Sequence, residues 1–206
     1  MKKIAVALLT LVLLCTLVAP TFAAVTKNAF ENVVLNANPD EFGYIANTEG
    51  RDRHGNTIQY VEGNGCGWSA EGDMVQFKNI DFGKNGAKEM TISFSYDGEA
   101  TSTLAAYLDN PKGQPFATFA TTSTGGWDIA HAKEFTTAVK VPGGVHDVYV
   151  KFTNAESGSF SYIRFAESAT PIAGTGAAPA TADMGVIASL AAIMTSAAGF
   201  VALKKR

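Results

Sequence analysis

The chain has 206 residues, with 16 lysines and arginines against 19 aspartates and glutamates, and its formal net charge is −3. It has no long basic stripe of the kind that nucleic-acid-binding domains present to phosphates, so nucleic acid is excluded as the expected partner. The two cysteines, Cys15 and Cys66, do not predict a disulfide framework, so the folded part has to be held by its core or by a metal.

The first 24 residues have the pattern of a secretion signal. Lys2 and Lys3 provide the charged start, residues 4–18 are apolar, and residues 21–24 offer small side chains at the cleavage position. The apolar run is short for a membrane span, so we predict a signal peptide over residues 1–24 and an extracellular location for the domain after it. Cys15 raises the alternative of lipid attachment, which the large residues before it do not favour.

Short stretches that alternate between apolar and polar residues succeed one another through the middle of the chain. Turn-forming residues separate them, and no stretch has the period of a helix. Many short strands at regular spacing are typical of a β-sandwich, so we predict an all-β domain of the jelly-roll type over residues 25–166. The expected strands are residues 30–35, 58–61, 74–82, 90–96, 103–108, 116–120, 135–141, 145–152 and 160–165.

The chain has two tryptophans, and each directly follows a glycine loop. Trp68 comes after Gly65 and Gly67, which bracket Cys66, and Trp127 comes after a pair of glycines. Glycine allows sharp turns and close approach of another molecule, so a large ring on such a loop can lie flat against a ligand. The alternative is that both rings are buried in the core. For Cys66, a small residue packed in a tight turn is favoured over a reactive thiol.

The C-terminal part predicts a tether. Residues 167–183 are rich in Ala, Pro, Gly and Thr, which cannot bury a core and indicate a linker. Residues 184–206 contain an uncharged apolar run followed by a basic tail, as in a transmembrane helix with its basic end in the cytoplasm.

Residues 179–183, Pro-Ala-Thr-Ala-Asp, stand just before this apolar run. Together with the helix and the basic tail they resemble a Gram-positive cell-wall sorting signal, although alanines stand where leucine and glycine are usual. The resemblance implies a sortase as partner, cleavage after Thr181, and attachment to the cell wall. The alternative is a chain that stays anchored in the cytoplasmic membrane.

The domain itself resembles family 6 of the carbohydrate-binding modules. The matching stretches come in the family's order and cover nearly the whole domain. They are Gly-Asp-Met-Val-Gln-Phe with Ile-Asp-Phe-Gly at 72–83, Leu-Asp-Asn-Pro-Lys-Gly at 108–113, Ser-Thr-Gly-Gly-Trp at 123–127, Gly-Val-His-Asp-Val-Tyr-Val-Lys-Phe at 144–152, and the closing strand at 160–165.

The resemblance implies a polysaccharide-binding cleft formed by loops at one end of the sandwich. By position, Trp68 and Trp127 match the aromatics that hold a sugar ring in this family. The family also uses an asparagine in the loop before the closing strand. In that place this chain offers Ser159, and Asn154 lies a few residues earlier.

Many members of the family carry a structural calcium, whose acidic ligands come from the first and last strands. Glu31 matches the place in the first strand, and Glu167 the place in the last. The resemblance therefore implies one calcium ion held partly by these two side chains. The alternative is that both glutamates are solvated charges at the sheet edge.

The sequence does not predict an enzyme. The acidic residues form no motif of paired carboxylates, the three histidines have no metal spacing, and no nucleophile or phosphate loop is present. We predict a surface protein that binds polysaccharide, of the β-glucan or xylan type, without cleaving it. The alternatives are a protein-interaction or adhesion module of the same fold and a weak glycoside hydrolase.

Overall fold

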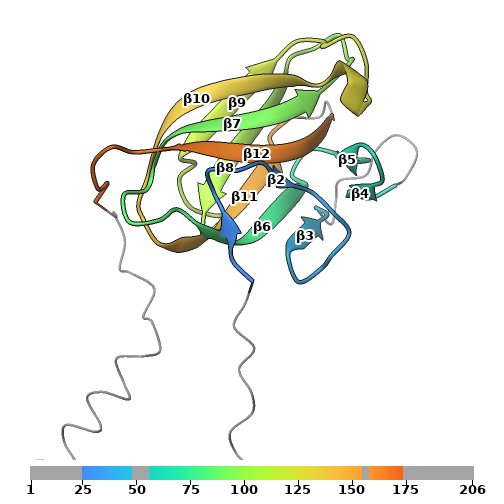
Figure 1. The fold of residues 1–206 in the computed structure, drawn as a ribbon. Coiled ribbons are helices and arrows are strands. Elements are labelled where there is room, and N and C mark those ends of the chain that lie inside the picture. Colours follow the sequence, from blue (N-terminus) through green and yellow to red (C-terminus); the bar gives the residue numbers. More distant parts are fainter. Residues whose placement is uncertain (1–24, 48–55, 155–157, 174–206) are drawn as a thin grey trace, which may run out of the picture.

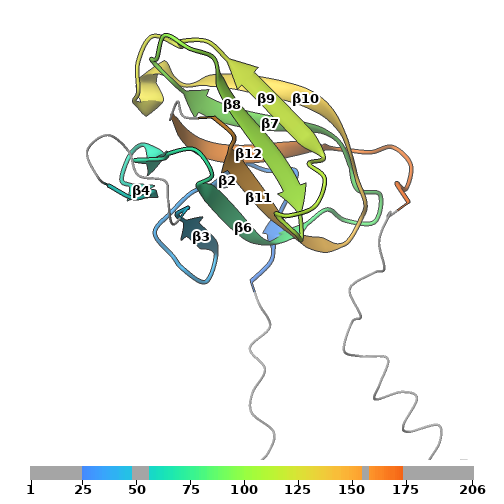
Figure 2. The ribbon, with the colours of Figure 1, turned by 180° about the vertical axis from the view of Figure 1, so that it is seen from behind.

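The computed structural model describes residues 25–47, 56–154 and 158–173, which form two β-sheets packed face to face (Figures 1 and 2). The predicted signal peptide, the predicted transmembrane helix and most of the predicted linker lie outside these residues. Among the described residues, no helix has the length and apolar character needed to cross a membrane.

The larger sheet has six strands in the order β1-β6-β11-β8-β9, and β3 shares with β1 the outer edge of β6. All its pairings are antiparallel except that of β1 with β6. Its strands are β1 (Lys27–Asn28), β3 (Phe42–Ile45), β6 (Met74–Asp81), β8 (Ser102–Leu108), β9 (Ala117–Thr121) and β11 (Val145–Phe152).

The smaller sheet has four antiparallel strands in the order β10-β7-β12-β2. Beside the sandwich, a separate two-stranded ribbon pairs β4 with β5, and one short 3₁₀ helix, η1, stands between β9 and β10. The strands and the helix are β2 (Val33–Val34), β4 (Gln59–Val61), β5 (Gly65–Gly67), β7 (Ala87–Ser95), β10 (Lys133–Val141), β12 (Ser159–Glu167) and η1 (Ile129–His131).

The core lies between the two sheets and is built from alternate residues of their long strands. In β11 every second residue from His146 onwards is buried, as expected for a strand with one face towards the core. Aromatic rings join the sheets, since Phe77 of β6 stacks on Phe160 of β12 with ring centroids 6.1 Å apart, and Phe82 meets Phe165 edge to face at 4.7 Å. Burial of this kind is the main stabilising contribution to folding.

Every strand expected from the sequence overlaps a strand of the structure, and the expected all-β class is confirmed. The expected strand at residues 30–35 is the least accurate, because only Val33–Val34 pair, with β12. The sequence does not predict three of the strands, β1, β3 and β5.

For β5 the sequence Gly-Cys-Gly predicts a loop. Its backbone runs so close to β12 that a Cβ at Gly65 would lie 2.2 Å from the carbonyl oxygen of Phe160, which explains the glycine.

Candidate functional site

Both tryptophans are on the surface at the end of the sandwich where β7 and β11 finish and β12 begins. Trp68 directly follows β5, and Trp127 lies in the connection between β9 and β10. The two residues are 44 % and 41 % exposed, so neither is a core residue. Exposed indole rings are costly in water and are enriched where a partner binds, so these two rings mark this end as the candidate site.

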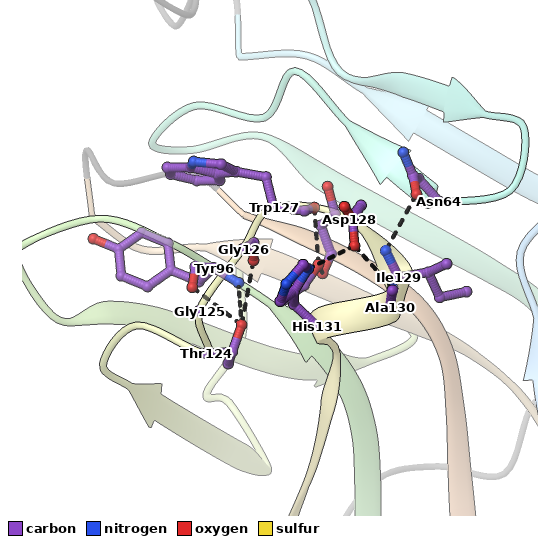
Figure 3. Close-up of polar contacts among 12 residues, drawn as sticks. Asn64, Tyr96, Thr124, Gly125, Gly126, Trp127, Asp128, Ile129, Ala130 and His131 are labelled. Carbon is purple, nitrogen blue, oxygen red and sulfur yellow. Dashed lines mark hydrogen bonds and ion pairs between the residues drawn. The ribbon is translucent and has the colours of Figure 1, made fainter.

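The Trp127 ring rests on a buried aromatic (Figure 3). Its neighbour is Tyr96, which is fully buried, and the two rings meet edge to face with centroids 5.4 Å apart. The backbone is fixed as well, because Gly126 forms a bridge with Tyr96 and the hydroxyl of Ser95 donates to the carbonyl oxygen of Trp127 at 3.0 Å. The ring is therefore held by Tyr96 on one side and stays partly exposed to solvent.

The loop before Trp127 is joined to the end of β7 by a buried threonine (Figure 3). The Oγ1 of Thr124 accepts a hydrogen bond from the N–H of Tyr96 at 3.0 Å, and the N–H of Thr124 donates to the carbonyl oxygen of Tyr96 at 2.7 Å. The threonine side chain thus continues the pairing beyond the last residue of the strand. This extra pairing explains how a loop rich in glycine keeps one conformation.

The turn after Trp127 is η1, which is capped by Asp128 (Figure 3). The Oδ1 of Asp128 accepts from the N–H of Ala130 at 3.0 Å and lies 2.8 Å from Nδ1 of His131. The hydrogen bond from His131 is the main cause that lowers the pKa of Asp128. The imidazole lies against Gly126, where a Cβ would come within 2.3 Å of Nδ1, so any side chain here would force the imidazole to move.

Trp68 has an unusual backbone. Its φ is 59°, in the left-handed region that bulky residues rarely adopt. Such a conformation persists only where the surroundings impose it, and it is found mostly at functional positions. The next residue, Ser69, is buried and supplies part of that constraint, since its hydroxyl donates to the carbonyl oxygen of Gly158 at 2.9 Å.

Hydrogen bonds join the two tryptophan segments through the start of β12. Ser69 contacts Gly158, and the hydroxyl of Ser95 shares its proton between the carbonyl oxygens of Trp127 and Ser159, the latter at 3.2 Å. A direct link also exists, because the side-chain oxygen of Asn64 accepts from the N–H of Ile129 at 3.2 Å (Figure 3). Three of the candidate residues, Trp68, Ser159 and Trp127, are thereby brought to one end of the sandwich.

Asn154 lies at the same end, but its side chain is engaged with the backbone. Its Oδ1 accepts from the N–H of Thr103 at 3.1 Å, and its Nδ2 donates to the carbonyl oxygen of Thr101. These bonds tie the end of β11 to the start of β8. Ser159 is half-buried, with its carbonyl oxygen turned to Ser95. Of the two polar candidates, Asn154 has the clearer structural role.

The two glutamates expected to hold calcium are both exposed. Glu31 accepts from Nδ2 of Asn28 at 3.2 Å, and Glu167 accepts from Nδ2 of Asn85 at 3.5 Å. Calcium takes roughly six to eight oxygen ligands. Within the described ranges, no three acidic, histidine or cysteine residues are grouped closely enough to hold a metal. The acidic side chains therefore do not by themselves form a calcium cage, and calcium binding stays a prediction.

Two other residues that the sequence brought forward are buried and structural. Cys66 is fully buried, its Sγ accepts from the N–H of Phe160 at 3.5 Å, and burial raises the pKa of the thiol to about 12. His146 is also buried, and its Nδ1 lies 2.8 Å from Oδ2 of Asp109. Cys66 thus packs beneath the tryptophan end, and His146 lies near the start of β11, away from it.

Sequence reasoning missed the residues that position Trp127. Asp128 is a residue type that often caps a helix, and His131 follows it three residues later. This spacing could have predicted the short helix after Trp127. Tyr96 and Asn64 gave no such signal, because they are distant in sequence from the residues that they contact.

A scan of protein-family models finds a match over residues 45–167 to "Carbohydrate binding module (family 6)". Among curated proteins, the chain is similar to endo-1,4-beta-xylanase A of Thermoclostridium stercorarium, with 27 % identity over 142 residues, which is 61 % of this chain and 27 % of the xylanase. The chain thus spans about a quarter of the length of the curated relatives that it matches.

Solved structures share the fold. A β-1,3-glucan-binding module of family 6 from Bacillus halodurans superposes with a TM-score of 0.52 at 21 % identity, covering 70 % of this chain and all of the module. A family 6 module from Clostridium stercorarium, solved with cellobiose, has a TM-score of 0.50 at 21 % identity. The match covers 71 % of this chain and the whole chain of that module. At these identities the likeness concerns the fold.

Proposed function

The chain belongs to family 6 of the carbohydrate-binding modules, and on that premise we propose that it binds a polysaccharide, without cleaving it, by holding a sugar ring between Trp68 and Trp127. The observation that carries the proposal is the pair of exposed indole rings on two separate segments at one end of the sandwich. Ser69 ties the Trp68 segment to Gly158, and the hydroxyl of Ser95 contacts the carbonyl oxygens of both Trp127 and Ser159.

The chemistry of such a site matches the two faces of a sugar. A pyranose ring has apolar C–H faces and polar hydroxyl edges, so an indole can cover the face while hydrogen bonds meet the edge. Stacking of a nucleic-acid base on an aromatic side chain, a comparable contact, contributes about 1–3 kcal/mol per ring. Two rings and a few hydrogen bonds then correspond to roughly micromolar to millimolar affinity.

We propose that Ser159, Asn154 and the exposed carboxylate of Asp128 supply the polar side of the site. Asp128 is next to Trp127 in the chain and is held in a fixed position as the cap of η1. Asn154 lies at the same end, just after β11, and its side chain is held there by bonds to two backbone groups of the segment leading into β8.

The proposed ligand is a β-linked glucan or a xylan. The support comes from relatives, because one similar module is named for binding β-1,3-glucan, another was solved with cellobiose, and the similar curated enzyme is named for cleaving xylan. We further propose that the chain acts at the outer surface of the cell, tethered through its C-terminal segment and attached by a sortase or retained in the membrane.

The test is binding of the purified protein to a panel of soluble β-glucans and xylans, measured by calorimetry. We expect binding to at least one glycan, and we expect Trp127→Ala and Trp68→Ala each to weaken it about tenfold or more, because each removes one stacking contact. Val145→Ala is the matched control. This valine is 40 % exposed at the start of β11, away from the tryptophan end, and its loss should leave affinity unchanged.

Two outcomes would replace the proposal. Absence of binding across the panel, or binding that both tryptophan variants retain, would favour a protein-interaction module that uses the same exposed rings or another surface. Release of reducing sugars from any glycan in the panel would favour a weak glycoside hydrolase.

A further inference from the structure

A buried lysine amine stands far from the tryptophan end. Lys27 belongs to β1, and its Nζ is hidden from solvent. Within the described part of the chain it is the one buried side-chain nitrogen or oxygen atom that makes no hydrogen bond. Its charged neighbour is Glu41, whose Oε2 lies 3.3 Å away, and the Phe42 ring lies with its centroid 5.0 Å from Nζ. The Glu41 carboxylate is therefore the main polar partner of an amine that is hidden from solvent.

The same carboxylate also holds an asparagine amide. Nδ2 of Asn36 donates to Oε2 of Glu41 at 3.3 Å, so the lysine amine and the asparagine amide contact one and the same oxygen atom. The other oxygen, Oε1, accepts from Nδ2 of Asn38 at 2.9 Å, which fixes the orientation of the carboxylate. The carbonyl oxygen of the Asn36 side chain accepts from the N–H of Asn38 at 2.7 Å, which polarises the amide carbon.

The fold sets up this grouping through β6. Both β1 and β3 pair with the outer edge of β6, where Lys27 lies opposite Ile80 and Phe42 opposite Phe77. The N–H of Lys78 donates to the carbonyl oxygen of Glu41 at 2.9 Å, which extends the β3 pairing to Glu41 itself. The chain between β1 and β3 therefore returns so that residues 36–41 lie against the amine of Lys27.

We propose that Lys27 and Asn36 are the two halves of an intramolecular isopeptide bond, formed by the protein on itself with Glu41 as the proton carrier. An amine, a primary amide, a carboxylate between them and a backbone N–H on the amide oxygen are the groups that such an amide exchange requires. The bond would join β1 to the segment that precedes β3, and it is independent of sugar binding.

The reaction needs no cofactor and no oxidant. The ammonium of Lys27 passes one proton to Oε2 of Glu41, and the neutral Nζ attacks Cγ of Asn36. The bond from Nζ to Cγ forms and the bond from Cγ to Nδ2 breaks. Two protons leave Nζ in all: Glu41 relays one to the departing NH2 group, which leaves as ammonia, and the second passes from Glu41 to solvent. The product is a neutral secondary amide, so the buried ammonium disappears. Every atom is accounted for, and the protein loses one ammonia molecule.

The state of Glu41 indicates where the reaction begins. Burial acts to raise the pKa of this carboxyl, but the hydrogen bond from Asn36 and the charge of Lys27 outweigh it, and the net pKa lies below the ordinary value. Before reaction Glu41 is thus a carboxylate, the form that can accept a proton from Nζ. Proton transfer from Nζ to Oε2 is then the first event, and we expect cross-linking to be slow compared with folding.

The test is the intact mass of the full chain, purified after prolonged incubation. We expect a mass lower than that of the unmodified sequence by one ammonia molecule, and a tryptic map in which cleavage after Lys27 fails and the peptide that contains residues 27 and 36 carries the whole mass loss. Lys27→Arg and Asn36→Ala should each have the unreduced mass. Glu41→Gln keeps the shape of the side chain but cannot carry the proton, so this variant should also have the unreduced mass.

The controls separate the cross-link from other losses of ammonia. Asn64 and Asn85 each precede a glycine and can lose ammonia by cyclising on the backbone, but that loss would persist in Lys27→Arg. Lys78→Met removes another lysine of the same region, whose Nζ donates to the carbonyl oxygen of Pro39 at 2.6 Å, and should leave the mass reduction in place. An unreduced mass for the wild-type chain, or a reduction that survives Lys27→Arg, overturns the proposal.

Discussion

Individual residues at the tryptophan end show how closely the loop before Trp127 is fitted. Gly126 forms a bridge with Tyr96 on one side and supports the imidazole of His131 on the other. The imidazole in turn contacts the carboxylate of Asp128 at 2.8 Å. A methyl group at Gly126 would therefore displace the imidazole that follows Trp127 in the same turn.

Replacing this glycine tests that displacement. In Gly126→Ala the new methyl group would lie 2.3 Å from Nδ1 of His131, so the imidazole has to move and the turn after Trp127 shifts with it. We expect glycan affinity to fall about tenfold, which corresponds to about 1.4 kcal/mol. Calorimetry measures the change. Adding His131→Ala should restore part of the affinity, because it removes the group that is struck.

The control for this substitution is another glycine in a turn. A Cβ at Gly113 would meet the carbonyl oxygen of Asn110 at 3.3 Å, and this turn lies at the far end of β8. Gly113→Ala should leave glycan affinity unchanged. Equal affinity of Gly126→Ala and the wild type would contradict the role given to the close contact.

At the scale of the elements, the start of β12 and the start of β6 organise the site. Gly158, just before β12, accepts from Ser69 of the Trp68 segment, and Ser159 of β12 is linked to Trp127 through the hydroxyl of Ser95. Asp73, just before β6, is fully buried and joins two other segments. Its Oδ1 accepts from the N–H of Asn47 at 2.6 Å, and its Oδ2 accepts from the N–H of Ala70 at 2.9 Å. This carboxylate thus connects the end of β3 with the segment that carries Trp68.

Burial raises the pKa of Asp73, although the two backbone hydrogen bonds act to lower it. The folded protein therefore binds a proton more readily at this site than the unfolded chain, whose aspartates titrate near about pH 3.9. The site's contribution to stability is fully present below that pH and is lost as the pH rises through the higher pKa of the folded state.

We therefore expect the free energy of unfolding of the wild type to fall relative to that of Asp73→Asn as the pH rises. The fall should lie between the pKa of an aspartate in the unfolded chain and the higher pKa of Asp73 in the folded protein. Urea unfolding of both proteins over a pH series measures the difference. The new asparagine side chain can also change stability in a way that does not depend on pH. Such a change shifts the difference in free energy of unfolding between the two proteins by a constant amount, so the test is how that difference changes with pH. A slope of the opposite sign would mean that the hydrogen bonds outweigh burial.

At the scale of the whole molecule, the two sheets enclose one continuous core, and Cys66 lies within it. The ribbon of β4 and β5 is therefore packed onto the sandwich and is not a separate flap. Since burial raises the pKa of the thiol to about 12 and its exposure is 0 %, reagents that need an accessible thiolate can reach it only when the packing opens.

In a chain with Cys15→Ser, we expect native protein to resist a thiol reagent and to react fully once unfolded. The reaction should increase with urea in parallel with the loss of tertiary structure measured by tryptophan fluorescence. With a thiol reagent that releases a coloured group when it reacts, the absorbance of that group measures the labelling of Cys66. Full labelling in buffer without urea would show that the ribbon opens independently of the sandwich.

Much of this architecture could be predicted, because the period of two in the long strands and the turn residues between them are local signals. Strands β6 to β12 follow from such patterns. The short strands β1, β3 and β5 could not be predicted, since two to four residues carry no period and their pairing depends on a distant partner. The two tryptophans could be predicted from their glycine loops. The contacts that position them could not, because Ser69 with Gly158 and Ser95 with Trp127 join residues far apart in sequence.

The direction of β12 has a mechanical consequence. This strand begins at the tryptophan end with Ser159 and finishes at Glu167, beside the turn between β6 and β7, close to where the described chain leaves the sandwich (Figure 1). It pairs with β7 along nearly its full length, from Ser95 to Ala87. When a load pulls the C-terminal side against a molecule gripped at the other end, the ladder between β7 and β12 is sheared lengthwise. All the hydrogen bonds between the two strands then resist together, whereas a pull at right angles to the strands would break them one after another.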